Sequence, residues 1–219
     1  MKHFFIFALF FLVGVLGIIT YGILQKNPGK PVTSIIQTVA KPNFDIAVAP
    51  SESIRGSIKQ MTGDVFWQSR TATESSQIPF DFAQGHGLQQ GEEIQTKENG
   101  NLTIEFPNVT NVVIAPKTQI DFVQTLPTEF VMSIASGSAN FKKLSETPVG
   151  IRSYHLLVRQ NSGEIGINVD TEKGFTNLNI ISGSVTVAYN DLNLDSHVVD
   201  FQAGKKVSFN DGTRTIVAE

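Results

Sequence analysis

The stretch GLQQGEEIQTKENGNLTIEF, residues 87–106, decides the fold of this chain. In its second half, apolar Leu102, Ile104 and Phe106 alternate strictly with polar residues. A period of two is typical of a β-strand that buries one face. In its first half, Gly91 precedes two acids and a second short alternation, and a glycine permits a sharp bend there. The stretch therefore predicts a corner that feeds a strand.

The same period of two continues through the rest of the chain. Between Ser53 and Glu219 we find about fifteen candidate strands, spaced at roughly ten residues and separated by Gly or Asn. No window shows helical amphipathicity for longer than a turn or two. The predicted fold class is all-β, with many short strands in stacked hairpins that form a sandwich or a solenoid-like β body.

Two pairs of similar segments within the sequence support a β body that is built from similar units. The segment FVMSIASGSANF (130–141) aligns with TNLNIISGSVTV (176–187), which matches Gly137 with Gly183. The segment QQGEEIQT (89–96) aligns with QAGKKVSF (202–209), which matches Gly91 with Gly204. We therefore expect repeated hairpins, each with a glycine corner between two strands.

Length and composition limit the classes of function. The chain has 219 residues and no cysteine, which excludes disulfides, thiolate catalysis, cysteine metal sites and a lipid-modified N-terminal cysteine. Residues 1–50 carry four Lys and one Asp, whereas residues 51–219 carry 13 basic and 19 acidic residues. An acidic body without a basic face argues against nucleic acid as a partner. One globular domain with an appendage is expected.

The appendage contains the uncharged run FFIFALFFLVGVLGIITYGIL, residues 4–24. As a helix it would span about 31 Å, which matches the hydrocarbon thickness of a bilayer. A cleaved signal peptide is the alternative, but its apolar region is shorter and ends at a small-residue cleavage site that is missing here. We predict an uncleaved transmembrane anchor over residues 1–25, a proline-containing linker over 26–50, and the β domain over 51–219.

The orientation of the anchor is predicted against the local count of lysines. Lys2 precedes the run, while Lys26, Lys30 and Lys41 follow it, and the positive-inside rule by itself would leave the body in the cytoplasm. Long domains cross the membrane largely regardless of loop charge. We therefore expect a single-pass protein of the cell membrane, with a cytoplasmic N-terminus and an extracytoplasmic body.

Several motifs, taken in order, resemble the FecR domain family. The resemblance spans residues 57–210 and is moderately specific, because no single motif is rare but their order and spacing agree. It rests on Gly87-Leu88-x-x-Gly91-Glu92-x-Ile94-x-Thr96, Leu102-x-Ile104-x-Phe106, Val113-x-Ala115-Pro116-x-Thr118-x-Ile120, Ser136-Gly137-Ser138-Ala139, the hairpin 163–169, the segment 181–187 and Val199-x-Phe201-x-x-Gly204-x-x-Val207.

The chain also departs from the family pattern. Glu92 stands where the family usually has Asp, the segment 106–110 replaces an Asp-Gly-Ser turn, and Gly163-Glu164 replaces Gly-Thr. The iron-citrate regulators of the family carry a cytoplasmic anti-sigma segment before the helix, whereas only residues 1–3 precede it here. The resemblance therefore implies an extracytoplasmic β domain that contacts a partner or ligand, without the transcriptional role.

Candidates for nucleophilic or acid–base chemistry lack the required spacing. The histidines, at positions 3, 86, 155 and 197, show no metal spacing, and His86 between two glycines is interpreted as a loop residue. Ser138 and Ser184 lie in Ser-Gly-Ser corners without a Gly-x-Ser-x-Gly elbow or a Ser-x-x-Lys motif. No catalytic residue is predicted.

Two acidic motifs are also interpreted as structural features and not as catalytic or metal-binding sites. Glu92 and Glu93 are neighbours on a strand and face opposite sides, so they would not share a proton; we expect a solvated corner, with Glu92 accepting bonds from turn amides. Asp191-x-Asn193-x-Asp195 resembles the start of a calcium loop, but Ser196 and Gln202 stand where Gly and Glu are needed. A polar hairpin tip is expected there, and no metal site.

The pair Phe66-Trp67 holds the chain's single tryptophan and offers a platform for a sugar or peptide. On a strand the two rings face opposite sides, so one belongs to the core. No ligand-binding residue and no cofactor is assigned from the sequence.

The predicted function is a membrane-anchored extracytoplasmic FecR-domain protein with a non-enzymatic binding, sensing or scaffold role in the cell envelope. Its partners would be the membrane, through residues 4–24, and an envelope protein or glycan. The alternative is a periplasmic lipid-handling β-jellyroll anchored by one helix, which would show a continuous apolar groove between sheets instead of a filled interior. The third hypothesis, an envelope glycan hydrolase, needs two carboxylates about 5 to 10 Å apart in a cleft.

Overall fold

The computed structural model describes residues 47–79 and 87–219, which lie within one compact unit, residues 45–219. Every regular element in these residues is a strand, which confirms the all-β prediction. No helix of the described residues is long and apolar enough to cross a membrane. The predicted anchor over 4–24, most of the predicted linker and His86 lie outside the described residues.

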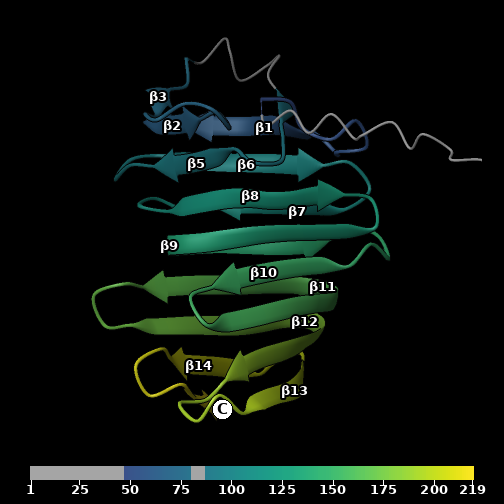
Figure 1. Ribbon diagram of the computed structural model, residues 1–219, viewed down its shortest axis with the longest axis vertical. Coiled ribbons are helices and arrows are strands. Elements are labelled where there is room, and N and C mark those ends of the chain that lie inside the picture. Colours follow the sequence, from purple (N-terminus) through teal and green to yellow (C-terminus); the bar gives the residue numbers. More distant parts are fainter. Residues whose placement is uncertain (1–46, 80–86) are drawn as a thin grey trace, which may run out of the picture. The chain divides into compact units, whose positions relative to one another are not determined.

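Fifteen strands form in the described residues, and Figure 1 shows them stacked one on another along the long axis of the body. They are β1 (Gly56–Thr62), β2 (Val65–Gln68), β3 (Ser76–Gln77), β4 (Gly87–Leu88), β5 (Glu93–Thr96), β6 (Asn101–Phe106), β7 (Thr110–Ile114), β8 (Gln119–Leu126), β9 (Glu129–Lys143), β10 (Val149–Ser153), β11 (Leu156–Asp170), β12 (Phe175–Asn190), β13 (Ser196–Gln202), β14 (Lys206–Asn210) and β15 (Thr215–Ala218).

All fifteen strands belong to one hydrogen-bonded network that divides into two branches at β9. The first half of β9 pairs with β8, which continues through β5 and β2 to β3. Its second half pairs with β7, which continues through β6 and β1 to β4. We call these branches layer A and layer B. The sheet is mixed, because β10 runs parallel to β9 while the other pairs are antiparallel.

The long strands β9, β11 and β12 belong to both layers, because each bends at a glycine. In β12, residues 175–179 pair with β14 in layer B, and residues 184–190 pair with β13 in layer A. The bends lie at Gly137, Gly163 and Gly183, which all have positive φ. Each bend shifts the buried positions by one residue, as from Ile134 to Ala139 in β9. The extra residue keeps the apolar side chains pointing inward on both sides of the corner.

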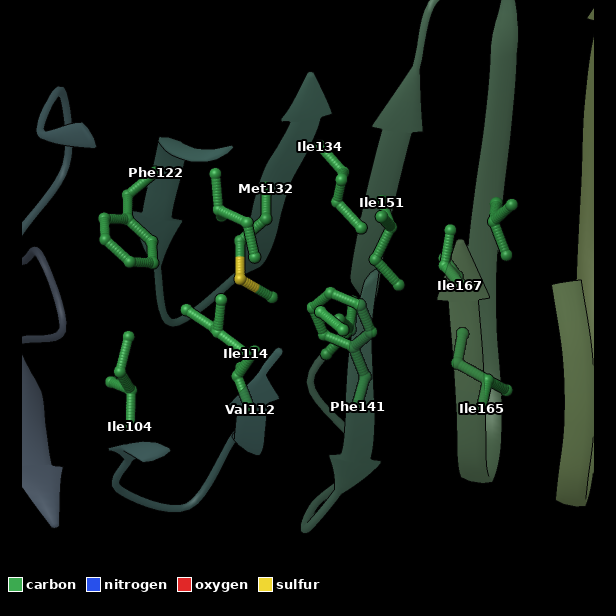
Figure 2. Close-up of a cluster of buried hydrophobic side chains, with 14 of the residues drawn as sticks. Ile104, Val112, Ile114, Phe122, Met132, Ile134, Phe141, Ile151, Ile165 and Ile167 are labelled. Carbon is green, nitrogen blue, oxygen red and sulfur yellow. The ribbon is translucent and has the colours of Figure 1, made fainter. Parts of the chain in front are cut away.

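The core lies between the two layers and is filled by side chains. Phe106 of layer B contacts two rings of layer A, Phe122 at 5.3 Å and Phe130 at 4.6 Å between ring centroids. Figure 2 shows Met132 and Phe122 on one side facing Ile104 on the other. These side chains are fully buried. Such packing leaves no continuous apolar groove between the layers in the part of the chain that the structure describes.

Candidate functional site

The Gly-Glu-Glu corner is a structural element whose first acid is buried. Gly91 has a φ of +82° and donates its N–H to the Phe122 carbonyl at 2.7 Å. The Glu92 side chain is only 2% exposed, and its Oε2 accepts the Gln89 N–H at 2.9 Å. Our expectation of a solvated corner was therefore wrong for Glu92, whereas its expected role as an acceptor of turn amides is confirmed. The side chain turns inward because its carboxylate closes the loop that precedes β5.

Glu93 faces the other way and lies opposite Asp121 of β8 in the register of the sheet. Partial burial raises the pKa of Glu93, and the nearby Asp121 carboxylate raises it further. The pKa of Asp121 is raised as well, chiefly by partial burial. Sequence reasoning missed this pair because the two acids are 28 positions apart, and only the strand register makes them neighbours.

The acid pair does not provide the cleft that a glycan hydrolase needs. Neither Glu93 nor Asp121 lines one of the five principal hollows of the described residues. The two side chains are direct cross-strand neighbours on a sheet face, where like charges repel and a substrate is not enclosed. We therefore expect the pair to affect how the stability of the protein depends on pH, and we assign it no role in catalysis.

The serine and histidine candidates are not brought together. His155 Nδ1 lies 2.8 Å from Asp211, and His197 Nε2 lies 3.1 Å from Asp191. Neither histidine bonds to Ser138 or to the other corner serine. In residues 47–79 and 87–219 no group of three or more metal-binding side chains occurs.

The calcium-like segment is a closed polar hairpin tip, as expected. Asp191 Oδ1 accepts the backbone N–H groups of Asn193 at 2.8 Å and Asp195 at 3.0 Å. Its other oxygen faces His197, and this hydrogen bond is the main cause that lowers the pKa of Asp191. One carboxylate oxygen of Asp191 is thus occupied by turn amides and the other by the His197 ring.

The aromatic pair divides between the two faces of β2, as predicted. Trp67 packs against the core next to buried Val65 on the same face of the strand. The Phe66 ring lies on the outer face, where Lys97 Nζ is 4.9 Å from the ring centroid. The lysine stacks over the ring.

The outer face of layer A carries two adjoining hollows at β9, β10 and β11. Hollows of about 620 and 350 Å³ share Glu129, Val131 and Leu157 as lining residues. Leu157 is 44% exposed, and Tyr154 beside it is 53% exposed. Large apolar and aromatic side chains with this exposure on a hollowed face are typical of protein interaction surfaces.

Three arginines line these hollows: Arg152 and Arg214 in the larger, Arg159 in the smaller. They are three of the five arginines of the chain. Their side chains make no hydrogen bond or ion pair with any described residue. Glu129 is the one carboxylate among the lining residues of both hollows. We call this surface the arginine face. Sequence reasoning did not single out these arginines, because only the fold brings three distant positions to one place.

Four of the residues that carry the FecR resemblance, Thr96, Ala115, Thr118 and Ser138, meet at one corner. The Thr96 hydroxyl donates to the Ala115 carbonyl at 2.7 Å and accepts the Thr118 N–H at 2.9 Å. The Thr118 hydroxyl in turn accepts the Ser138 N–H at 2.9 Å. Thr96 and Thr118 are both 1% exposed. These bonds join β5 to the loop before β8 and to the bend of β9, so the motif has a structural role here.

Comparisons with known proteins show a likeness of fold. No protein-family model matches the chain, and no curated protein matches it in sequence. Two crystal structures described as a "putative anti-sigma factor from Parabacteroides distasonis ATCC 8503" resemble it, with TM-scores of 0.50 and 0.51 at 16% and 15% identity. In both cases 58% of this chain matches 58% of the other, so the chain spans little more than half of those structures.

Proposed function

We propose that this chain is a membrane-anchored, extracytoplasmic FecR-type protein that binds an envelope protein through the arginine face. The role is non-enzymatic, in sensing or signalling. The arginine face is the observation that carries the proposal. The likeness of fold to proteins described as anti-sigma factors supports a regulatory role. The apolar run 4–24 supports the anchor.

The chemistry of the arginine face indicates the kind of partner. Unpaired guanidinium groups on an acidic domain favour carboxylates, which they bind in a bidentate way. The exposed Leu157 and Tyr154 side chains, which line the larger hollow with Arg152, favour an apolar anchor. The partner is therefore expected to present an acidic segment that carries at least one large apolar side chain.

The experiment compares capture of the partner by charge-reversal variants of the full-length chain. The tagged protein is cross-linked in cells and purified from membranes, and captured proteins are identified by mass spectrometry. Arg152→Glu combined with Arg159→Glu should lose the partner, because each charge-assisted bond contributes about 1.5 to 3 kcal/mol. Lys142→Glu combined with Lys205→Glu changes the net charge equally at exposed positions and should retain it.

Two outcomes would count against the proposal. Equal capture by both double variants would show that the arginine face is not the binding surface. A captured protein whose binding does not weaken with salt would contradict the carboxylate chemistry, because ion pairs at an exposed surface are screened by salt.

The two other functional classes are less well supported. The lipid-handling alternative requires an apolar groove between the layers, and the described part of that space is filled by side chains such as Phe106, Phe130 and Phe141. The hydrolase alternative requires two carboxylates facing each other across a cleft. The Glu93–Asp121 pair lies on an open sheet face instead.

A further inference from the structure

A further hollow, of about 520 Å³, lies on the outer face of layer B, opposite in orientation to the arginine face. It is formed over β9, β11, β12, β14 and β15. The strand register aligns its polar side chains in two neighbouring rows. One row is Ser138, Asn168, Asn177 and Ser208; the other is Asn140, Gly166, Asn179 and Lys206. We call it the amide hollow.

Gly166 lies in the middle of its row and leaves room there for the Asn140 side chain. A Cβ at this position would lie 2.7 Å from Asn140 Oδ1. Buried Ile167 and Leu178 belong to the same strands beneath the rows, so the floor is rigid. Gly166 has no positive φ, so its backbone conformation does not require a glycine. The absence of a side chain at Gly166 therefore lets the Asn140 amide lie over β11, inside the hollow.

The amides that surround Gly166 are unpaired within the described part of the chain. The side chains of Asn140, Asn168 and Asn179 are exposed and make no hydrogen bond there. Asn177 is the exception, because its Oδ1 accepts the Ser208 hydroxyl at 2.9 Å. Each amide offers two N–H donors and one carbonyl acceptor. Three free amides thus line one hollow.

We propose that the amide hollow binds a neutral oligosaccharide. Sugar hydroxyl groups both donate and accept, which matches amides that offer both functions side by side. The two charged lining residues, Lys206 and Glu219, have opposite signs, so neither an anion nor a cation is favoured overall. Val217, which is 62% exposed at the rim, supplies an apolar contact for the C–H face of a ring.

A peptide is the less suitable occupant. Peptides that bind to β structures gain specificity from pockets for alternate side chains. Val217 is the one exposed apolar side chain among the lining residues, which leaves such a peptide without anchors. The inference does not depend on the arginine face, because the two surfaces belong to different layers.

The test is calorimetric titration of the full-length chain, kept in a detergent that is not a glycoside. The probes are maltotetraose, cellotetraose and chitotetraose, with tetraalanine amide as the peptide probe. We expect at least one sugar to bind. Gly166→Val should abolish binding by displacing the Asn140 amide from the hollow. Asn168→Ala should weaken binding about fivefold, as expected for one lost hydrogen bond. Asn193→Ala, at the β12–β13 hairpin, is the matched control and should bind like the parent.

The results decide the proposal in either direction. Failure of all three sugars to bind would overturn the proposal, and so would unchanged sugar binding in Gly166→Val. Binding of the peptide alone would also overturn it and would assign the hollow to a peptide. Should Gly166→Val fail to fold, Asn168→Ala decides, because its side chain is exposed and makes no described bond. Loss of sugar binding would leave capture through the arginine face intact, so the two proposals fail separately.

Discussion

Gly163 and Gly183 lie directly opposite each other in the β11–β12 pair, and both adopt positive φ, +77° and +78°. A Cβ on Gly163 would lie 2.2 Å from the Ser182 carbonyl oxygen, and one on Gly183 would lie 2.3 Å from that of Ser162. Each glycine thus makes room for the backbone of the other strand. The two long strands can bend together from one layer to the other only because neither has a side chain at this point.

The first prediction concerns this paired corner. Gly183→Ala should destabilise the protein by at least about 3 kcal/mol, because it adds a left-handed backbone penalty to a backbone clash that cannot relax by a rotamer change. Urea titration of the full-length chain measures the free energy of unfolding. Gly204→Ala is the control: its φ is +86° but no atom lies within 4 Å of the added Cβ, so it should cost about 1 kcal/mol. Similar losses in both variants would contradict the clash.

The second prediction concerns the buried acid of the Gly-Glu-Glu corner. Glu92→Ala should cost about 1 to 3 kcal/mol, because the Gln89 N–H would lose its side-chain acceptor in a partly buried loop. Thermal unfolding of the variant is compared with that of Glu98→Ala. Glu98 forms an exposed ion pair with Lys117, so its removal should change stability by no more than about 0.5 kcal/mol. An unchanged thermal stability of Glu92→Ala would show that the Glu92 side chain does not stabilise the corner.

The third prediction is a pH dependence of stability. The pKa values of Glu93 and Asp121 are raised in the folded state, so the folded protein binds protons more tightly than the unfolded chain does. The pair therefore favours folding below its raised pKa values and loses this contribution as the pH rises through them. Asp121→Asn should stabilise the protein at neutral pH, by about 0.5 kcal/mol, by removing the repulsion.

Thermal midpoints of the parent and of Asp121→Asn, followed from about pH 4 to pH 7, measure this effect. The gain of the variant over the parent should shrink toward the acid end, because the raised pKa values favour proton uptake by the folded parent there. Asp195→Asn, at the β12–β13 hairpin tip, provides the comparison for an exposed acid. A gain that is independent of pH would show that the carboxylates do not interact.

The fourth prediction tests the topology of the anchor. Because the chain has no cysteine, a single one can be introduced as a reporter. Thr171→Cys, at the exposed β11–β12 turn, should react with a membrane-impermeant maleimide in intact spheroplasts. Lys2→Cys should react only after the membrane is permeabilised, since the N-terminus is expected in the cytoplasm. The reverse pattern of labelling would place the body in the cytoplasm, in agreement with the count of lysines.

The sequence by itself determined the class of fold and the position of its corners. Alternation of apolar and polar residues is a local signal, so strands such as 101–106 were predictable without knowledge of their partners. The glycines that the internal alignments matched were equally informative. Gly91, Gly137, Gly183 and Gly204 all have the positive φ that a corner requires. A backbone conformation that few residues tolerate leaves a direct trace in the sequence.

Only the tertiary structure decided which side chains meet. Glu93 and Asp121 became neighbours through the β5–β8 register, and Glu92 was buried because its loop closes against the Phe122 backbone. The arginine face combines residues of β10, β11 and the β14–β15 hairpin, and the amide hollow combines five strands. Strand alternation states which face a residue occupies, but the neighbour across the sheet depends on register and bends, which are set by contacts between distant segments.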